Sequence, residues 1–200
     1  MSMKLILLLI FISLLGCRDG GIVETSCNRD WRTNQYEVYS TIIDKIYGNS
    51  NQTIIIFEKT RKNEDNFKLF FNDEWLKLIK KDFPDIKTSI ADSFNSNNEQ
   101  SATLEQKFNL KVPYKFVSET DFAEINSDYM ERFNKFARKF PEAVSQTSQR
   151  TVLFSQPGFD ENFSQAVVFV EIWNDRKSFF FLKKESCRWK IVKDNTVSLH

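Results

Sequence analysis

The chain of 200 residues has the length of one globular domain with short extensions. Charged residues make up 28% and hydrophobic residues 41%, so the chain can form a core and does not have the composition of a disordered protein. The 28 basic and 27 acidic residues nearly cancel, which argues against nucleic acid as a partner. The single histidine, His200, excludes most histidine-dependent catalysis.

Residues 1–16 have the layout of a secretory signal peptide. Lys4 precedes an apolar run over residues 5–15 that stops at a small residue, Gly16. As a helix this run would be about 16 Å long, roughly half of a ~30 Å hydrocarbon core. No second apolar stretch of about 18 residues follows. We therefore expect export and a mature chain without a transmembrane helix.

The tetrapeptide Leu14-Leu15-Gly16-Cys17 resembles the lipobox of bacterial lipoproteins, with Leu three residues before the cysteine and Gly directly before it. The resemblance implies that the Cys17 thiol receives a diacylglycerol and, after cleavage, becomes the N-terminus, with fatty acids such as palmitate as the anchor. It places the protein in the cell envelope, on the periplasmic or cell-surface side of a membrane. The alternative is an ordinary signal peptide cut elsewhere, with Cys17 free or in a disulfide.

Removal of residues 1–16 takes away Lys4 and no acidic residue, so the mature chain has equal numbers of basic and acidic residues. Membrane attachment is therefore expected to depend on lipid, since each buried methylene contributes about 0.8 kcal/mol.

The two other cysteines, Cys27 and Cys187, are an even number in an exported chain, which makes a disulfide plausible. Such a bridge would close a loop of about 160 residues and contribute a few kcal/mol. Two separate thiols are the alternative, because a sequence gives no distance between the two residues.

Residues 18–33 are polar and show no sustained period, which predicts a lipidated tether over 17–33 and one globular domain over 34–200. Helical spacing of apolar residues predicts a helix over 36–47, with Asn34 as its cap and Gly48 as its stop. The pattern predicts three more helices over 76–83, 86–94 and 129–140, a buried strand over 53–57 and an exposed loop over 95–101.

Beyond residue 150 the pattern changes to strands, predicted over 151–155, 165–173, 177–183 and 188–192 and joined by short turns. These four strands are expected to form an antiparallel meander. Both faces of the strand over 165–173 are largely apolar, so helices or a partner are expected to cover each side. We predict an α+β fold with helices packed on a four-stranded antiparallel meander, in a cystatin-like or NTF2-like layout.

The C-terminal third also resembles a loose group of uncharacterised bacterial secreted or lipid-anchored proteins. The likeness covers about 60 residues and lies in Ser155-x-x-Gly158-Phe159, in the alternating strand that follows, and in Trp189-Lys190-Ile191 at the end of a hairpin. This chain has Asp175-Arg176-Lys177 where such proteins carry glycines. The group implies no activity.

Two features of the sequence are candidates for a binding or catalytic site. Oxygen-bearing residues from Asp160 to Glu171 partly match a calcium-binding loop, but Gln165 occupies the place that needs Gly, so a turn leading into a strand is favoured. Glu171 interrupts an apolar strand face and is the candidate polar site, either a ligand-binding or catalytic acid or a glutamate that reaches water or a lysine. We predict no metal site and no cofactor.

The sequence contains no complete set of catalytic residues, and an enzyme is disfavoured. We expect a lipid-anchored cell-envelope protein with a binding or structural role and an envelope protein as partner. The first alternative is a small-ligand-binding or hydrolytic cone-shaped domain, and the second is an immunity or inhibitor lipoprotein.

Overall fold

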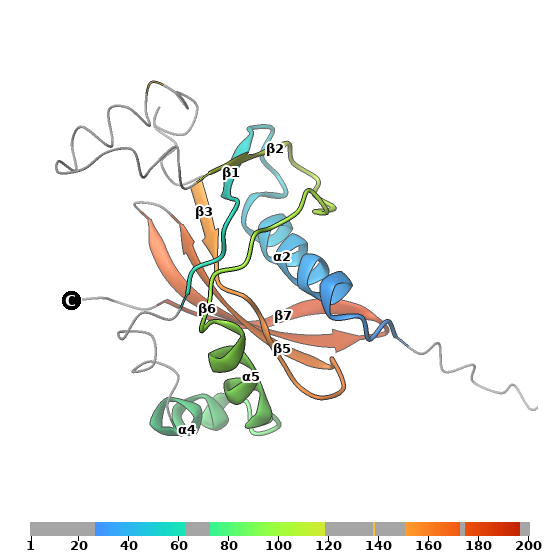
Figure 1. Cartoon of the computed structure of the whole chain (residues 1–200). Coiled ribbons are helices and arrows are strands. Elements are labelled where there is room, and N and C mark those ends of the chain that lie inside the picture. The colour runs from blue at the N-terminus through green and yellow to red at the C-terminus, as the bar shows by residue number, and fades with distance from the viewer. Residues whose placement is uncertain (1–26, 63–72, 119–137, 139–150, 173–174, 197–200) are drawn as a thin grey trace, which may run out of the picture.

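A computed structural model describes residues 27–62, 73–118, 138, 151–172 and 175–196 (Figure 1). Its helices and strands are, in chain order, α2 (Trp31–Tyr47), β1 (Ile54–Phe57), α4 (Asp73–Asp82), α5 (Ser89–Asn97), β2 (Tyr114–Val117), β3 (Thr151–Phe154), β4 (Gly158–Phe159), β5 (Gln165–Ile172), β6 (Arg176–Glu185) and β7 (Arg188–Thr196). Helices and one sheet make up the described fold, which confirms the α+β class.

The strands form a mixed sheet in the order β2-β1-β3-β5-β6-β7, with β4 paired to β5. Strands β3, β5, β6 and β7 are antiparallel neighbours, so the predicted meander is present. The sheet has seven strands, however, because β1 and β2 extend it through parallel pairing beyond β3 and the short β4 pairs with β5. All four residues of β1 are buried, as expected for a strand that lies between two parallel neighbours.

Helices cover both faces of the meander (Figure 1). Along β5, Val168 and Val170 pack in one core cluster with residues of α2, whereas Val167 and Phe169 pack in a second cluster with residues of α4 and α5. Successive residues of a strand point to opposite faces, and therefore an almost continuously apolar strand requires a cover on each side. This confirms the expectation drawn from the two apolar faces.

Helix α2 begins five residues earlier than the sequence pattern predicts. Asp30 is its N-cap and accepts a hydrogen bond from the backbone N–H of Thr33 at 2.7 Å. Asn34, predicted as the cap, is fully buried within the helix. The packed domain thus includes residues that the pattern assigned to a tether over 17–33, because Cys27 bonds to Cys187, and Trp31 packs against Phe159 of β4. Gly48 ends the helix as predicted.

Helices α4 and α5 confirm the two predicted short helices, with shifted bounds. The exposed loop predicted over 95–101 is wrong in its first part, since α5 continues to Asn97 and Asn98 is fully buried. The side chain of Asn98 accepts from the backbone of Gln156 at 2.7 Å and donates to its carbonyl at 2.8 Å. The helix predicted over 129–140 lies outside the described residues apart from Arg138, which is helical.

Candidate functional site

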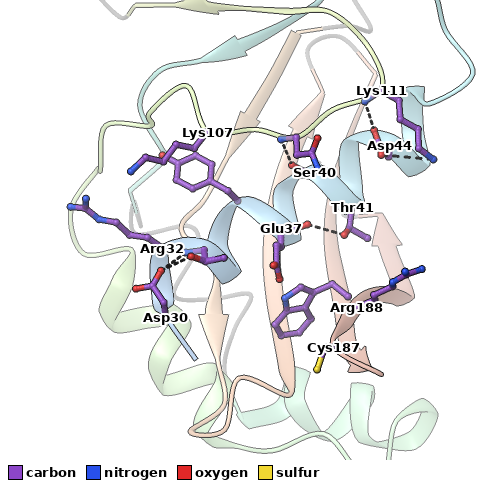
Figure 2. Close-up of a pocket in the computed structure, with 14 residues that line it drawn as sticks. Asp30, Arg32, Glu37, Ser40, Thr41, Asp44, Lys107, Lys111, Cys187 and Arg188 are labelled. Carbon is purple, nitrogen blue, oxygen red and sulfur yellow. Dashed lines mark hydrogen bonds and ion pairs between the residues drawn. The ribbon is translucent and has the colours of Figure 1, made fainter. Parts of the chain in front are cut away.

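A groove of about 950 Å³ runs along the exposed side of α2 (Figure 2). Three stretches that are far apart in the sequence line it: α2 with its cap, the residues Lys107, Asn109 and Lys111, and the first residues of β7 with the preceding Cys187. We call it the α2 groove. Both its shape and its chemistry follow from how these three stretches are held together.

Side chains on one face of α2 hold the segment 105–111 against the helix. Tyr36, Ser40 and Asp44 lie four residues apart, so they share a face of the helix. Their oxygens accept backbone hydrogen bonds from Glu105 at 2.5 Å, Asn109 at 3.2 Å and Lys111 at 3.1 Å, respectively. Burial raises the pKa of Tyr36, which therefore stays protonated at neutral pH. One bank of the groove is thus a segment fixed to α2 at three points.

The turn between β6 and β7 forms the other bank. Ser186 and Cys187 both have positive φ, 47° and 61°, which is the conformation of a two-residue type I′ hairpin turn. Cys187 forms a disulfide with Cys27, with the two Cα atoms 5.1 Å apart. The pairing that the cysteine count left open is therefore present in the structure. It joins the beginning of the described chain to its last hairpin.

Polar contacts reinforce this junction. The Lys184 ammonium lies 4.9 Å from the centre of the Trp189 ring and donates hydrogen bonds to the backbone carbonyl of Asn28 and to the side chain of Asn34. The indole N–H of Trp189 also donates to Asn34, at 3.1 Å. Desolvation lowers the pKa of Lys184, and the nearby Glu37 carboxylate partly opposes this effect. Asn34 thus connects α2 to both strands of the hairpin.

Three acidic residues line the groove along α2, at intervals of seven residues. Asp30 is held as the helix cap, and its hydrogen bond to Thr33 lowers its pKa. Asp44 accepts from the backbone of Lys111. The third acid, Glu37, also lines the groove, as does Trp189. Glu37 and Arg188 are exposed charges that line the groove and form no ion pair within the described residues.

Glu105 gathers two of the basic residues at the rim of the groove. Arg32 lies 3.3 Å from one of its carboxylate oxygens and Lys107 lies 2.5 Å from the other. The hydrogen bond from Lys107 lowers the pKa of Glu105. Because all three side chains are substantially exposed, these ion pairs add little stability and leave the groove polar.

The predicted polar residue Glu171 does not line this groove. It lies near the end of β5, where one oxygen pairs with Lys177 at 3.3 Å and the other with Arg61. Lys177 is directly opposite Glu171 on β6. Burial, together with the charge of Arg61, lowers the pKa of Lys177. Glu171 is thus the centre of a three-residue charge cluster, and its contact with a lysine matches one of the two interpretations of the sequence.

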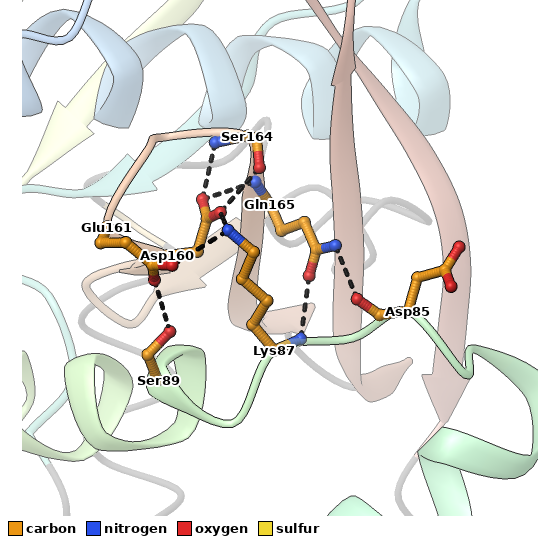
Figure 3. A network of polar contacts seen from close by, with 7 residues as sticks. All are labelled: Asp85, Lys87, Ser89, Asp160, Glu161, Ser164 and Gln165. Atoms are coloured by element: carbon orange, nitrogen blue, oxygen red, sulfur yellow. Dashed lines mark hydrogen bonds and ion pairs between the residues drawn. The ribbon is translucent and has the colours of Figure 1, made fainter.

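Asp160 caps the turn between β4 and β5 (Figure 3). Its carboxylate accepts from the backbone and hydroxyl of Ser164, both at 2.6 Å, and from the backbone of Gln165 at 2.9 Å. Lys87 adds an ion pair at 2.7 Å. Glu171, the last residue of the possible calcium-binding loop, pairs with other side chains. It lies six residues farther along β5 than Gln165, a distance of about 20 Å in an extended strand. The turn interpretation of this segment is therefore the one that the geometry supports.

The α2 groove offers charges of both signs, hydroxyl groups and the side chain of Trp189. Among the residues that the structure describes, no group of three metal-binding side chains is found, and no helix is long and apolar enough to span a membrane. Cys17 lies outside the described residues.

The structure brings Cys187 to the groove, with Cys27 bonded to it, and leaves Glu171 apart from both. Sequence reasoning missed Ser40, Asn109 and Arg188. One local signal was available, since acidic residues seven apart on a predicted helix must share a face. No such signal identifies the two banks of the groove. They come from segments far from α2 in the sequence, and the spacing of residues within a segment does not show which other segment it will contact.

Comparison with known proteins gives no identity for the chain: no family model, no curated protein and no solved structure matches it.

Proposed function

We propose that the protein is a lipid-anchored protein of the cell envelope that acts without catalysis by holding a segment of an envelope protein in the α2 groove. Support for the anchor comes from the leader over residues 1–16 and from the Leu14-Leu15-Gly16-Cys17 motif. Support for binding comes from an open groove of about 950 Å³ lined by exposed charges of both signs.

The position of the disulfide is the observation that carries the proposal. Cys187 both lines the groove and bonds to Cys27. The stretch 17–27 spans at most about 35 Å when fully extended. A lipid on Cys17 would therefore keep the groove within a few nanometres of the membrane surface, where a partner in the same membrane is at high effective concentration.

The charges suggest what the groove holds. Glu37 on α2 and Arg188 on β7 are exposed and both line the groove (Figure 2). A polypeptide segment with a basic side chain for Glu37 and an acidic one for Arg188 would complement both charges. Binding of a polypeptide segment is compatible with an immunity or inhibitor function as well as with a structural function. The identity of the bound protein would distinguish between these functions.

Metabolic labelling with an alkyne fatty acid tests the anchor. The wild-type chain is expected to carry the label and to fractionate with membranes, whereas Cys17→Ser loses both. Cys27→Ser is the matched control and should keep the label, since that thiol is in the disulfide. Retention of the label by Cys17→Ser would rule out lipidation at this residue.

Site-specific photo-crosslinking in intact envelopes tests the groove. A photoreactive residue at Thr41, in the groove, is expected to give one discrete adduct, and the same residue at Ser96, exposed on α5, is not. Charge reversal by Glu37→Lys or Arg188→Glu should reduce the yield severalfold, because each substitution repels one charge of the partner. Equal adducts from both positions, or yields unchanged by both reversals, would contradict binding in the groove.

A second candidate function is a small-ligand-binding or hydrolytic cone centred on Glu171, with the cystatin-like or NTF2-like layout. One observation favours it, namely a mostly buried carboxylate beside two cations. It is the weaker candidate because both oxygens of Glu171 are already paired, and a cone would need an open concave face where α2, α4 and α5 cover the meander.

A further inference from the structure

A second concavity, of about 340 Å³, lies on the other face of the sheet from α2. Its apolar lining includes Phe83, Ile86, Ile90, Phe181 and Val192. We call it the β7 cleft. Its volume is within the roughly 300–1,000 Å³ typical of small-molecule sites. Val192 is 38% exposed and is the one large hydrophobic residue left exposed among those that the structure describes.

The wall of the cleft is held in place by polar contacts (Figure 3). The side-chain amide of Gln165 donates to the carbonyl of Asp85 at 2.9 Å and accepts from the backbone of Lys87 at 3.1 Å. Lys87 is tied in turn to Asp160 at 2.7 Å. The loop that carries Phe83 and Asp85 is therefore fixed to β5, and the cleft is formed before any ligand arrives.

Lysines surround the mouth of the cleft. Lys183 lines it, and Lys190 is directly opposite Lys183 on the neighbouring strand. Lys193 is opposite Phe181, and its ammonium lies 5.7 Å from the centre of the Phe83 ring. Residues directly opposite in an antiparallel pair share a face, so all three lysines lie on the side of the cleft.

Lys183 is the lysine of this group with which an additional anion could pair. Two lysines directly opposite each other on paired strands repel. Glu185 pairs with Lys190 at 2.6 Å, whereas Lys183 forms no ion pair among the residues that the structure describes. An anion placed between Lys183 and Lys190 would relieve the repulsion, while an aliphatic chain would cover the exposed Val192.

We propose that the β7 cleft binds an anionic amphiphile, a molecule with an aliphatic chain and a carboxylate or phosphate head. Its chain would lie against Phe83, Phe181 and Val192, and its head would lie at Lys183 and Lys190. This site shares no lining residue with the α2 groove, so it does not depend on the partner proposed there.

Isothermal titration calorimetry tests the site on the secreted, unlipidated chain, prepared as Cys17→Ser behind a cleavable secretory leader. Sodium laurate and dodecyl phosphate, each below its micellar concentration, are expected to bind with one site per chain. Dodecyl glucoside, which has the same chain and no charge, should bind roughly three- to tenfold more weakly, the effect of one screened charge pair. Laurate and dodecyl phosphate separate a carboxylate from a phosphate ligand.

Substitutions then assign the site. Lys183→Glu should weaken laurate binding by roughly three- to tenfold or more, because the head meets a negative charge. Val192→Asp should abolish binding, whereas Val192→Leu should retain it, and both are compatible with an exposed position. Lys111→Glu, in the α2 groove, is the control that should leave affinity unchanged. Absence of laurate binding, equal affinity for the glucoside, or affinity unchanged in both Lys183→Glu and Val192→Asp would overturn the proposal.

Discussion

Asp160 is a buried carboxylate that connects two elements distant in sequence. Burial alone raises the pKa of a carboxyl group, but the hydrogen bonds from Lys87, Ser164 and Gln165 stabilise the charged form more, and the pKa of Asp160 is lowered. A carboxylate with these bonds stabilises the fold only while it is ionised. Its contribution is therefore present above the unfolded-state pKa of about 3.9 and is lost as the pH falls through the lower folded-state value.

Asp160→Asn should remove this dependence on pH. At pH 7 the variant is expected to lose about 2–3 kcal/mol of unfolding free energy, because an amide cannot replace a charged acceptor of several hydrogen bonds. Urea unfolding between pH 7 and pH 2 measures the difference, and the two stabilities should converge at the acid end.

The neighbouring Glu161 is the control for this prediction. Its side chain is 61% exposed although it also contacts Lys87, so Glu161→Gln should change the unfolding free energy by no more than about 0.5 kcal/mol. Parallel pH profiles of wild type and Asp160→Asn would show that the Asp160 charge contributes nothing to stability.

At the scale of elements, the contact of α5 with β4 depends on the absence of a side chain at Gly158. A Cβ there would lie 2.5 Å from the carbonyl oxygen of Ile90 and 2.6 Å from both the backbone nitrogen and the Cβ of Phe94. Two of these atoms belong to the backbone of the helix and cannot move alone. The helix therefore lies directly on the strand, which places Ile90 in the second core cluster.

Gly158→Ala is expected to destabilise the protein by about 1–3 kcal/mol, since α5 must shift away from the sheet. Thermal unfolding followed by circular dichroism measures the loss. Ser96→Ala, on the exposed side of the same helix, should leave the melting temperature within about 2 °C of wild type. A Gly158→Ala variant as stable as wild type would show that the contact adjusts without cost.

Elements with a strong local pattern were predictable. The helical spacing behind α2, the apolar run of β1 and the alternation along β5 all reflect burial of one or two faces, which sequence periodicity records. Strand β2 was missed, because only one of its four residues, Val117, is buried and the strand depends on its pairing with β1. The start of α2 was misplaced because Asn34 is polar yet buried.

At the scale of the whole molecule, one covalent bond ties the first described residue to the final hairpin. The disulfide between Cys27 and Cys187 joins residues 160 positions apart, so it encloses nearly all of the described fold. In the chain-entropy account, closing so long a loop restricts the unfolded chain strongly. The contacts of Lys184 and Trp189 with Asn34 lie at the same junction and keep it packed.

Loss of the disulfide should cost about 3–5 kcal/mol of unfolding free energy. Cys27→Ser and Cys187→Ser are each expected to show this loss in urea unfolding, and the double variant should be no less stable than either, because each substitution breaks the same bond. Thiol titration of the denatured wild-type protein isolated after export should find neither cysteine reactive. Additive losses in the double variant would contradict a shared bond.

The sequence by itself determined the α+β class, the main helices, the strands of the meander and the need to cover both faces of β5, because each of these is written in local periodicity and composition. Only the tertiary structure decided the order of the sheet, the pairing of Cys27 with Cys187 and the two concavities. The α2 groove joins α2 to residues 107–111 and β7, and the β7 cleft joins Phe83 to Val192. Such sites depend on the distances between segments that are far apart in the sequence. Packing and strand register set those distances, and local sequence patterns do not record them.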